Sequence, residues 1–355
     1  MTDSNLSTSV DPVIEVEALV KRFGDVVALD GIDLSVERGT VFGLLGPNGA
    51  GKTTAVRILT TILSHDSGTA RVLGIDVDQN PQAVRERIGL AGQYAAVDEN
   101  LTGRENLRMV GELTHMPRKV TLQRADELLE RFGLTHAADR PARTYSGGMR
   151  RRLDLGAALV HRPPVLFLDE PTTGLDPASR NDLWVVIQEL VADGTTVLLT
   201  TQYLEEADRL ADLIAVIDGG RKIAEGTSAQ LKATLGATIV EIGTADADQT
   251  TRAQSLLAAV GTVEAEGRIV KVNINEGARG VLDVARLLEQ DDLVPDSFTV
   301  REPTLDDVFL SLTGHKADVS DEPSDDERLG ARPPGGATNT AGSDGDRPLA
   351  EEAFR

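Results

Sequence analysis

The sequence predicts an α/β fold with a parallel sheet at its core and a small α+β domain behind it. Two uninterrupted apolar runs, 41–45 and 165–168, are typical of strands buried on both faces of a parallel sheet. The first run precedes a glycine-rich turn and a segment with helical spacing at Val56, Leu59 and Ile62. The later part of the chain changes to strand, helix, two strands, helix and strand, an order typical of a ferredoxin-like domain.

A small antiparallel sheet is expected at the start of the chain, and a helical subdomain in its middle. Strand patterns at 14–16 and 34–36 lie before the glycine-rich turn and predict this sheet. Apolar residues with helical spacing precede Gly133, a residue type that often follows the end of a helix. These apolar residues are Leu122, Ala125, Leu128, Leu129 and Phe132. Further along, Asp218-Gly219-Gly220-Arg221 predicts a hairpin turn between two strands.

The same patterns divide the chain into four segments. We expect a flexible N-terminus at 1–12, an α/β domain at 13–235, an α+β accessory domain at 237–314 and a disordered tail at 315–355. The tail is polar, acidic and poor in large apolar residues, which favours disorder. Within the accessory domain we expect strands at 238–242 and 297–300, helices near 249–260 and 278–288, a hairpin across 262–274 and a final helix at 305–312. A stabilising appendage and a regulatory domain fit this part equally well.

The amino-acid composition limits which kinds of partner and site are expected for the chain. With a net charge of -21 over 355 residues, nucleic acid is not expected as a main partner, and neither is general adhesion to anionic lipid. The absence of cysteine excludes disulfides and thiolate metal sites. No uncharged run approaches the ~18 apolar residues that span a bilayer, and the start lacks the basic and apolar parts of a signal peptide. We therefore expect a soluble chain that borrows any membrane-spanning part from a partner.

The glycine-rich turn fits the phosphate-loop pattern G-x-x-x-x-G-K-[ST]. Its residues are Gly46, Pro47, Asn48, Gly49, Ala50, Gly51, Lys52, Thr53 and Thr54. Glycines there let successive backbone N–H groups close around phosphates, and the helix behind them offers its positive N-terminus. Lys52 would reach the β- and γ-oxygens of ATP, and the Thr53 hydroxyl would ligate Mg²⁺. A glycine-rich surface turn is the alternative, and the flanking strand and helix argue against it.

Two carboxylates, Asp169 and Glu170, follow the second buried run directly. Sites of parallel sheets lie at the carboxyl ends of the strands, so these side chains are expected near the phosphate loop. Asp169 would hold Mg²⁺, directly or through water, and Glu170 would polarise the attacking water as general base. Two solvated acids before Pro171 are the alternative, which leaves their place after a buried strand unexplained.

With both halves of a nucleotide site in place, residues 13–235 resemble the ATP-binding subunit of an ABC transporter. The segment Tyr145-Ser146-Gly147-Gly148-Met149 separates this family from other phosphate-loop ATPases. The resemblance implies that this loop and the helix behind it contact the γ-phosphate bound by a second copy. A head-to-tail homodimer with two shared ATP sites is therefore expected. Considered alone, Ser146-Gly147-Gly148 is better explained as a helix N-cap after a loop, whereas its position among the other motifs favours the phosphate contact.

Three further residues match the family more weakly. Gln93 matches the loop whose Gln senses Mg²⁺ and water and whose neighbours touch the membrane subunit. Asp176, in Gly174-Leu175-Asp176-Pro177, matches the loop that ties the two protomers together, and is equally well explained as a helix N-cap. Phe23 matches the aromatic residue that stacks on adenine, and an ordinary core residue is the alternative.

Gln202, in Thr200-Thr201-Gln202, stands where most of the family has His. No His lies between His161 and His315 to replace it. A Gln amide donates to a phosphate oxygen and accepts from water, but it cannot become cationic. Modest ATP hydrolysis rather than none is therefore expected. The resemblance implies that the catalytic residues are Glu170, Lys52, Gln202 and Gln93.

The sequence around the motifs is similar to that of the daunorubicin-resistance type of export ATPase. The similar segments are 145–154, 200–208 and 305–310. The resemblance implies export of a drug or hydrophobic natural product through a separate membrane permease, with this chain at the cytoplasmic face of the cell membrane. A soluble ATPase that acts as a regulator or scaffold, and an exporter of another cargo such as lipid, are the alternatives.

Overall fold

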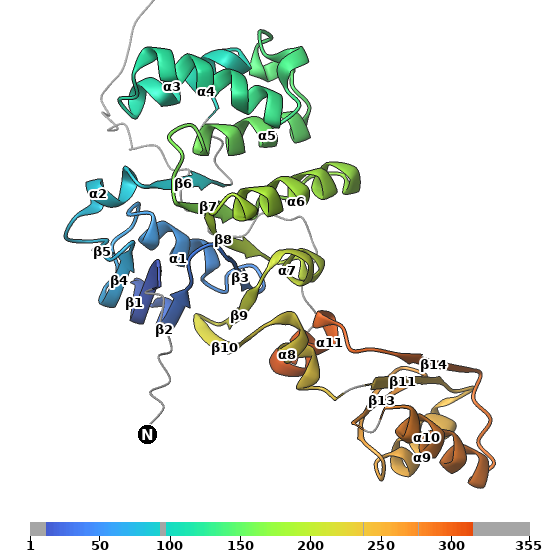
Figure 1. Ribbon diagram of the computed structural model, residues 1–355. Helices are drawn as coiled ribbons and strands as arrows, with labels where there is room; N and C mark the ends of the chain where they lie inside the picture. Colours follow the sequence, from blue (N-terminus) through green and yellow to red (C-terminus); the bar gives the residue numbers. More distant parts are fainter. Residues whose placement is uncertain (1–11, 93–96, 237, 276, 315–355) are drawn as a thin grey trace, which may run out of the picture. The chain divides into compact units, whose positions relative to one another are not determined.

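The computed structural model describes residues 12–92, 97–236, 238–275 and 277–314, and three sheets organise these residues (Figure 1). The expected flexible N-terminus, apart from its last residue, and the expected tail lie outside the described residues, as does Gln93. The domain limits at 13–235 and 237–314 stay predictions. No helix in the described ranges is both long and apolar enough to cross a membrane.

The first sheet is antiparallel, with the order β2-β1-β4-β5. Its strands are β1 (Ile14–Phe23), β2 (Val26–Val36), β4 (Ser67–Val72) and β5 (Ile75–Asp76). Both strand patterns predicted near the start of the chain fall in β1 and β2, which pair directly. The prediction of a small antiparallel sheet is therefore confirmed.

The second sheet has the order β10-β9-β3-β8-β7-β6. Its strands are β3 (Val41–Leu45), β6 (Ile88–Ala91), β7 (Val165–Asp169), β8 (Thr196–Thr201), β9 (Leu213–Asp218) and β10 (Arg221–Gly226). All pairings are parallel except that β10 runs antiparallel to β9, across the predicted hairpin turn. Every residue of β3 and β7 is buried, as the apolar runs predict for strands covered on both faces.

The helix that follows the phosphate loop is shorter than its spacing predicts. Helical spacing extended it to Ile62, but α1 (Lys52–Leu59) ends earlier and the Ile62 side chain is 63% exposed. The chain has left helical geometry by Thr61, whose φ is +63°. The other helices of this part are α2 (Pro81–Arg85), α6 (Pro177–Ala192), α7 (Leu204–Leu210) and α8 (Ser228–Ala233).

The predicted helical subdomain is present between β6 and β7 (Figure 1). It consists of α3 (Gly103–Leu113), α4 (Arg118–Arg131) and α5 (Gly147–Ala158), with two short 3-10 helices, η1 (Thr135–Ala137) and η2 (Ala142–Thr144). Gly133 follows the end of α4 with a φ of +66°, as expected for a glycine that closes a helix.

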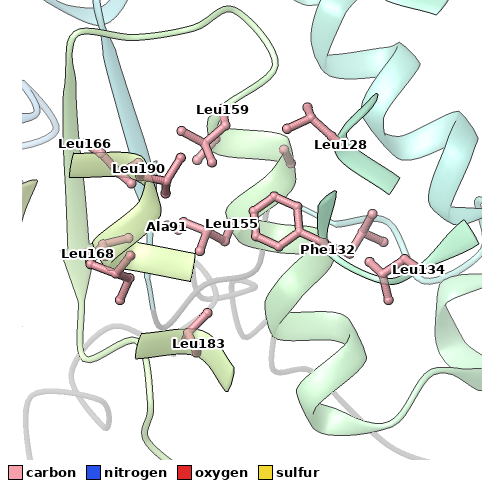
Figure 2. Packing of buried hydrophobic residues seen from close by; sticks show 14 of the residues in the cluster. Ala91, Leu128, Phe132, Leu134, Leu155, Leu159, Leu166, Leu168, Leu183 and Leu190 are labelled. Atoms are coloured by element: carbon pink, nitrogen blue, oxygen red, sulfur yellow. The ribbon is translucent and has the colours of Figure 1, made fainter. Parts of the chain in front are cut away.

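A shared apolar core joins this subdomain to the parallel sheet. Figure 2 shows the Phe132 ring beside Leu155 of α5, in a cluster of buried side chains that also contains Leu166 and Leu168 of β7. Burial of these side chains removes apolar surface of both parts from water. The position of α5 is therefore linked by packing to the strand that carries Asp169.

The third sheet has the order β12-β13-β11-β14, and all its pairings are antiparallel. Its strands are β11 (Thr238–Gly243), β12 (Thr262–Glu266), β13 (Ile269–Ile274) and β14 (Ser297–Arg301), and its helices are α9 (Ala247–Leu257) and α10 (Ala278–Gln290). The last strand lies beside the first, so the predicted ferredoxin-like arrangement is confirmed. Val240, Val272, Ala253 and Val284 belong to its core.

The final helix, α11 (Leu305–Thr313), returns to the first part of the chain. Its Val308 and Phe309 share a buried cluster with Leu204 of α7 and Leu231 of α8. The helix begins with a capping box, in which Thr304 and the residue three positions later satisfy each other's backbone N–H groups.

Arg301, at the end of β14, binds two carboxylates. Its Nε and Nη2 donate to Glu241 Oε1 at 3.0 and 2.8 Å, and its Nη1 and Nη2 donate to the two oxygens of Asp307 at 2.6 and 2.9 Å. Burial alone would raise the pKa of Asp307, but the hydrogen bonds from Arg301 and Thr304 outweigh burial and hold this pKa at about 2. The ionised Asp307 thus fixes the first turn of α11 to the third sheet.

The substitution Asp307→Asn is predicted to lower the free energy of unfolding by about 1–2 kcal/mol at neutral pH, after a discount for partial exposure. Because the pKa is lowered in the folded state, the stabilisation is complete above the unfolded pKa and is lost as the pH falls toward about 2. Urea unfolding of both proteins at about pH 7 and about pH 3 measures this difference, which should be roughly halved at the lower pH. An equal difference at both pH values would contradict the assignment.

Candidate nucleotide-binding site

The predicted phosphate loop leaves β3 and enters α1 at the carboxyl edge of the parallel sheet (Figure 1). Gly49 and Gly51 have φ angles of +79° and +106°, a region that favours glycine. A Cβ on Gly51 would lie 2.4 Å from the carbonyl oxygen of Ala28, and a Cβ on Gly46 would lie 2.2 Å from that of Ile217. Backbone geometry therefore explains glycine at each of these three positions.

Lys52 lies inside the loop, and its side chain is only 4% exposed. Its Nζ donates to the carbonyl oxygens of Gly46 at 2.7 Å and Pro47 at 3.0 Å, and lies 3.5 Å from Glu170 Oε1. Burial lowers the pKa of Lys52, while Glu170 and Asp169 oppose this shift by favouring the ammonium form. The geometry places one cation, held by two carbonyls and a carboxylate, at the start of α1.

The Asp169 carboxylate connects three elements at the same edge of the sheet. Its Oδ1 accepts hydrogen bonds from the Thr200 hydroxyl on β8 at 2.5 Å and the Thr53 hydroxyl on α1 at 3.1 Å. Asp169 itself is buried at the end of β7. The structure thus brings together Thr53 and Asp169, two of the three residues predicted at the metal, although they are 116 positions apart in the sequence. The third, Gln93, lies outside the described residues.

Thr53 and Asp169 suit a Mg²⁺ ion that is held jointly with a nucleotide. Mg²⁺ is commonly bound through one or two carboxylates together with water and substrate phosphates. The pair offers one hydroxyl and one carboxylate, both hard oxygen donors, and the two groups already touch. Within the described ranges, no cluster of three or more Asp, Glu, His or Cys side chains offers a complete metal site. Phosphate oxygens and water would therefore supply the other ligands.

Glu170 is buried immediately beyond β7, so the alternative of two solvated acids before Pro171 is wrong. Its φ is +49°, a left-handed conformation that is uncommon for a residue with a side chain. Its Oε2 accepts from the Thr173 hydroxyl at 3.3 Å, and its backbone N–H donates to the Thr200 hydroxyl at 3.1 Å. These contacts aim the carboxylate toward Lys52 and the phosphate loop.

Ser146 is the N-cap of α5, because its side chain accepts a hydrogen bond from the Met149 N–H at 3.2 Å. Gly147 and Gly148 form the first turn of this helix. Among the described residues, no hydrogen bond joins these three residues to the phosphate loop of the same chain. The N-cap explanation of Ser146 is therefore confirmed, and its contact with the phosphate of a second copy stays a prediction.

Asp176 is likewise the N-cap of α6, with Pro177 at the first helical position. It accepts from the Ser179 N–H at 3.1 Å and from the Ser179 hydroxyl at 2.6 Å. These bonds from Ser179 lower the pKa of Asp176. A Cβ on Gly148 would lie 2.8 Å from the Ser179 hydroxyl, so the start of α5 and the start of α6 are close neighbours. The N-cap prediction for Asp176 is confirmed.

Phe23 is not a core residue, because its side chain is 49% exposed at the end of β1. The Lys21 ammonium lies 5.5 Å from the ring centroid, which is within reach of a cation–π contact. An exposed ring of this kind suits stacking on a planar base, and stacking on adenine stays a prediction. Gln93, the other weakly matched residue, lies outside the described residues.

Gln202 follows β8 directly and is buried. Its Oε1 has no hydrogen-bond partner among the described residues. The carbonyl oxygen of the preceding residue, Thr201, accepts from the Gly46 N–H at 3.3 Å, so β8 and the start of the phosphate loop are in contact. The structure therefore brings Gln202 to the same edge of the sheet as Lys52 and Asp169.

Two polar residues near the site carried no predicted role. Thr200 binds both Asp169 and the backbone of Glu170, and its position at the end of a strand was the signal that could have identified it. Glu206 is fully buried and accepts from the Trp184 indole at 3.0 Å. Burial raises the pKa of Glu206, which no sequence pattern indicates.

The comparisons with known proteins agree with this geometry. The family model described as ABC transporter matches residues 29–173. The chain is 53% identical to the daunorubicin resistance ATP-binding protein DrrA2 of Streptomyces coeruleorubidus, over 86% of this chain and 96% of that protein. It is 48% identical to the daunorubicin/doxorubicin resistance ATP-binding protein DrrA of Streptomyces peucetius, over 91% of this chain and 100% of that protein.

A solved structure shares the fold. The ADP conformation of MJ1267, an ATP-binding cassette of an ABC transporter, is similar with a TM-score of 0.55 and 29% identity, over 62% of this chain and 92% of that chain. Together with the converging nucleotide-site residues, these similarities settle the family. The chain is an ABC-type ATPase that belongs to the ATP-binding subunits of ABC transporters, in the group of the daunorubicin-resistance proteins.

Proposed function

We propose that this chain is the motor subunit of an exporter, and that it couples ATP binding and hydrolysis to transport through a separate membrane permease. One observation carries the proposal: Lys52, Thr53, Asp169 and Glu170 form a continuous network at the carboxyl ends of the parallel strands. Two relatives are named for daunorubicin resistance, so a drug or hydrophobic natural product is the proposed cargo. The proposed location is the cytoplasmic face of the cell membrane.

The proposed reaction assigns a separate task to each residue. Lys52 would exchange its bonds to the loop carbonyls for bonds to β- and γ-phosphate oxygens. Mg²⁺ bound by Thr53 and Asp169 would neutralise charge on the phosphates. Glu170 would accept a hydrogen bond from the attacking water, and Gln202 would donate to the γ-phosphate. Gln93 would complete the catalytic group by sensing the metal and the water.

A homodimer is proposed to complete each site. The start of α5, at Ser146, Gly147 and Gly148, would meet the γ-phosphate bound by the phosphate loop of a second copy. Asp176, at the neighbouring start of α6, would lie at the boundary between the two copies. Closure of the pair would then transmit force through the Gln93 region to the permease. Phe23 would stack on adenine from its exposed position at the end of β1.

A nucleotide-binding scaffold with little turnover is the second candidate. The neutral Gln202 favours it, because this side chain cannot supply the positive charge that a His can supply. The ionisable Glu170 beside the phosphate loop favours hydrolysis. Measured turnover of Mg-ATP by the purified chain separates the two candidates.

The substitution Glu170→Gln is predicted to lower kcat by about a hundredfold or more, because the amide cannot accept a proton from the attacking water. Affinity for Mg-ATP should be retained, and ATP-trapped dimers should accumulate in size-exclusion chromatography. Glu205→Gln is a matched control, since Glu205 is an exposed carboxylate on α7. Equal turnover of Glu170→Gln and the parent chain would refute the assignment of the base.

Gly147→Ala tests whether the second copy contributes to the site. A Cβ at Gly147 would meet no atom within 4 Å in its own chain, so thermal stability should not fall. If the start of α5 faces a phosphate bound by the partner, the added methyl group would displace that phosphate. Turnover should then drop by about tenfold to a hundredfold. Parallel measurements of the melting temperature and of kcat test this, and unchanged turnover would argue against the shared site.

The substitution Gln202→His is predicted to raise kcat, because an imidazolium adds charge stabilisation at the γ-phosphate. Gln202→Ala should lower kcat by about tenfold, since it removes the donor and the acceptor together. Steady-state kinetics of both variants over the same range of ATP concentration provide the measurement. If neither variant differs from the parent chain, Gln202 takes no part in the reaction.

A further inference from the structure

Arg151 lies on α5, one turn behind Ser146, and points away from the terminus of that helix into the parallel sheet domain. Its side chain is 16% exposed, in contrast to the half-exposed side chain of the neighbouring Arg150. Family resemblance assigned no task to Arg151. It is therefore a largely covered cation within the nucleotide-site region that the proposed reaction does not use.

The guanidinium group of Arg151 donates to four backbone carbonyl oxygens. Nε donates to Pro171 at 2.6 Å, and Nη1 donates to Gly92 at 2.6 Å. Nη2 donates to Glu170 at 2.8 Å and to Asp169 at 3.3 Å. One side chain of the helical subdomain thus binds three successive peptides at the end of β7 and the peptide that follows β6.

One of these carbonyl groups belongs to Glu170, whose backbone conformation is strained. Glu170 has a φ of +49°, a strained conformation that a residue with a side chain keeps only where the surrounding structure holds it. Arg151 binds the carbonyl of Glu170 and of both its neighbours in the chain, so it holds the backbone on each side of the strained residue. The direction of the Glu170 carboxylate follows from this backbone conformation.

Charge balance keeps the guanidinium in place. Burial lowers the pKa of Arg151, and the nearby Asp154, Asp169, Glu206 and Glu170 carboxylates oppose that shift. Asp154 is buried one turn further along α5, with its Oδ2 3.7 Å from Arg151 Nη1. An arginine stays charged in proteins, so all its N–H groups remain donors.

We propose that Arg151 is a positioning residue that couples the movement of α5 to the aim of the Glu170 carboxylate. The inference rests on the proposed function, in which α5 moves toward the phosphate of a second copy and Glu170 acts on water. A shift of α5 would pull on the carbonyls of Asp169, Glu170 and Pro171 through the planar guanidinium. Base alignment is therefore tied to the position of the helix that begins at Ser146.

A lysine should not replace this arginine. The ammonium group carries the same charge, but it lacks the planar array of donors that reaches four carbonyls at once. A merely electrostatic or stabilising role would survive Arg151→Lys, whereas positioning would not. Arg151→Gln, which keeps only an amide, gives a second variant with a different effect on folding.

The test uses the full-length chain and steady-state ATP hydrolysis. Both Arg151→Lys and Arg151→Gln should lower kcat by about tenfold to a hundredfold, because small displacements of a reacting group have such effects. KM for Mg-ATP should change less than about twofold, since Arg151 does not touch the phosphate loop. Arg152→Gln is the matched control, because Arg152 is the next residue of α5 and pairs with Asp182 of α6 at 2.6 Å.

Thermal unfolding of each variant separates positioning from stability. Loss of kcat at temperatures where the variants remain folded, with KM retained and with Arg152→Gln active, supports the proposal. Parental kcat in Arg151→Lys overturns it, as does a loss of kcat that only follows the folded fraction. Glu170→Gln identifies the source of a failure: parental turnover in that variant refutes the proposed base. If Glu170→Gln is inactive while both Arg151 variants are fully active, only the positioning role is refuted.

Discussion

The hydrogen bonds of the Asp169 carboxylate determine the arrangement on which the nucleotide site depends. A buried carboxylate is costly unless it is paired or hydrogen-bonded. Asp169 meets this requirement by accepting from Thr200 of β8 and Thr53 of α1, so the ends of β7 and β8 and the start of α1 are held at one point. Lys52 and Glu170, each adjacent in sequence to one of these residues, are thereby brought within ion-pair distance.

Helix termini recur among the predicted site residues. Lys52 and Thr53 begin α1, Ser146 caps α5, and Asp176 caps α6. Such termini present backbone N–H groups and partial positive charge, which suits them to phosphate. The glycines of the phosphate loop allow the backbone itself to approach an anion. The start of α5 lies close to the start of α6, which the Asp176 carboxylate already caps. The same physical device thus serves both halves of the proposed shared site.

Much of this organisation could be predicted from the sequence. The strands β3 and β7 were recognisable because both faces are buried, which leaves uninterrupted apolar runs. Asp169 and Glu170 were identified because sites of parallel sheets lie beyond the strand ends. The boundary of α1 was not, since Ile62 continues the apolar spacing although the backbone has already turned at Thr61. Periodicity alone does not register that turn.

The contacts of Arg151 could not be predicted at all. They run to backbone atoms 18 to 59 positions away, and backbone acceptors leave no pattern in side-chain chemistry. The positive φ of Glu170 could not be predicted either, because a left-handed conformation is expected at glycine and not at a residue with a side chain. Both features emerge only when β6, β7 and α5 are packed together through the core that contains Phe132 and Leu155.

A crystal structure of the Glu170→Gln chain with Mg-ATP would test whether these residues form one nucleotide site. We expect a γ-phosphate bound by Lys52, with Mg²⁺ held by Thr53 and Asp169 and with Ser146, Gly147 and Gly148 of a second copy on the opposite side. A triphosphate placed away from Lys52, or a metal ion that contacts neither Thr53 nor Asp169, would contradict it.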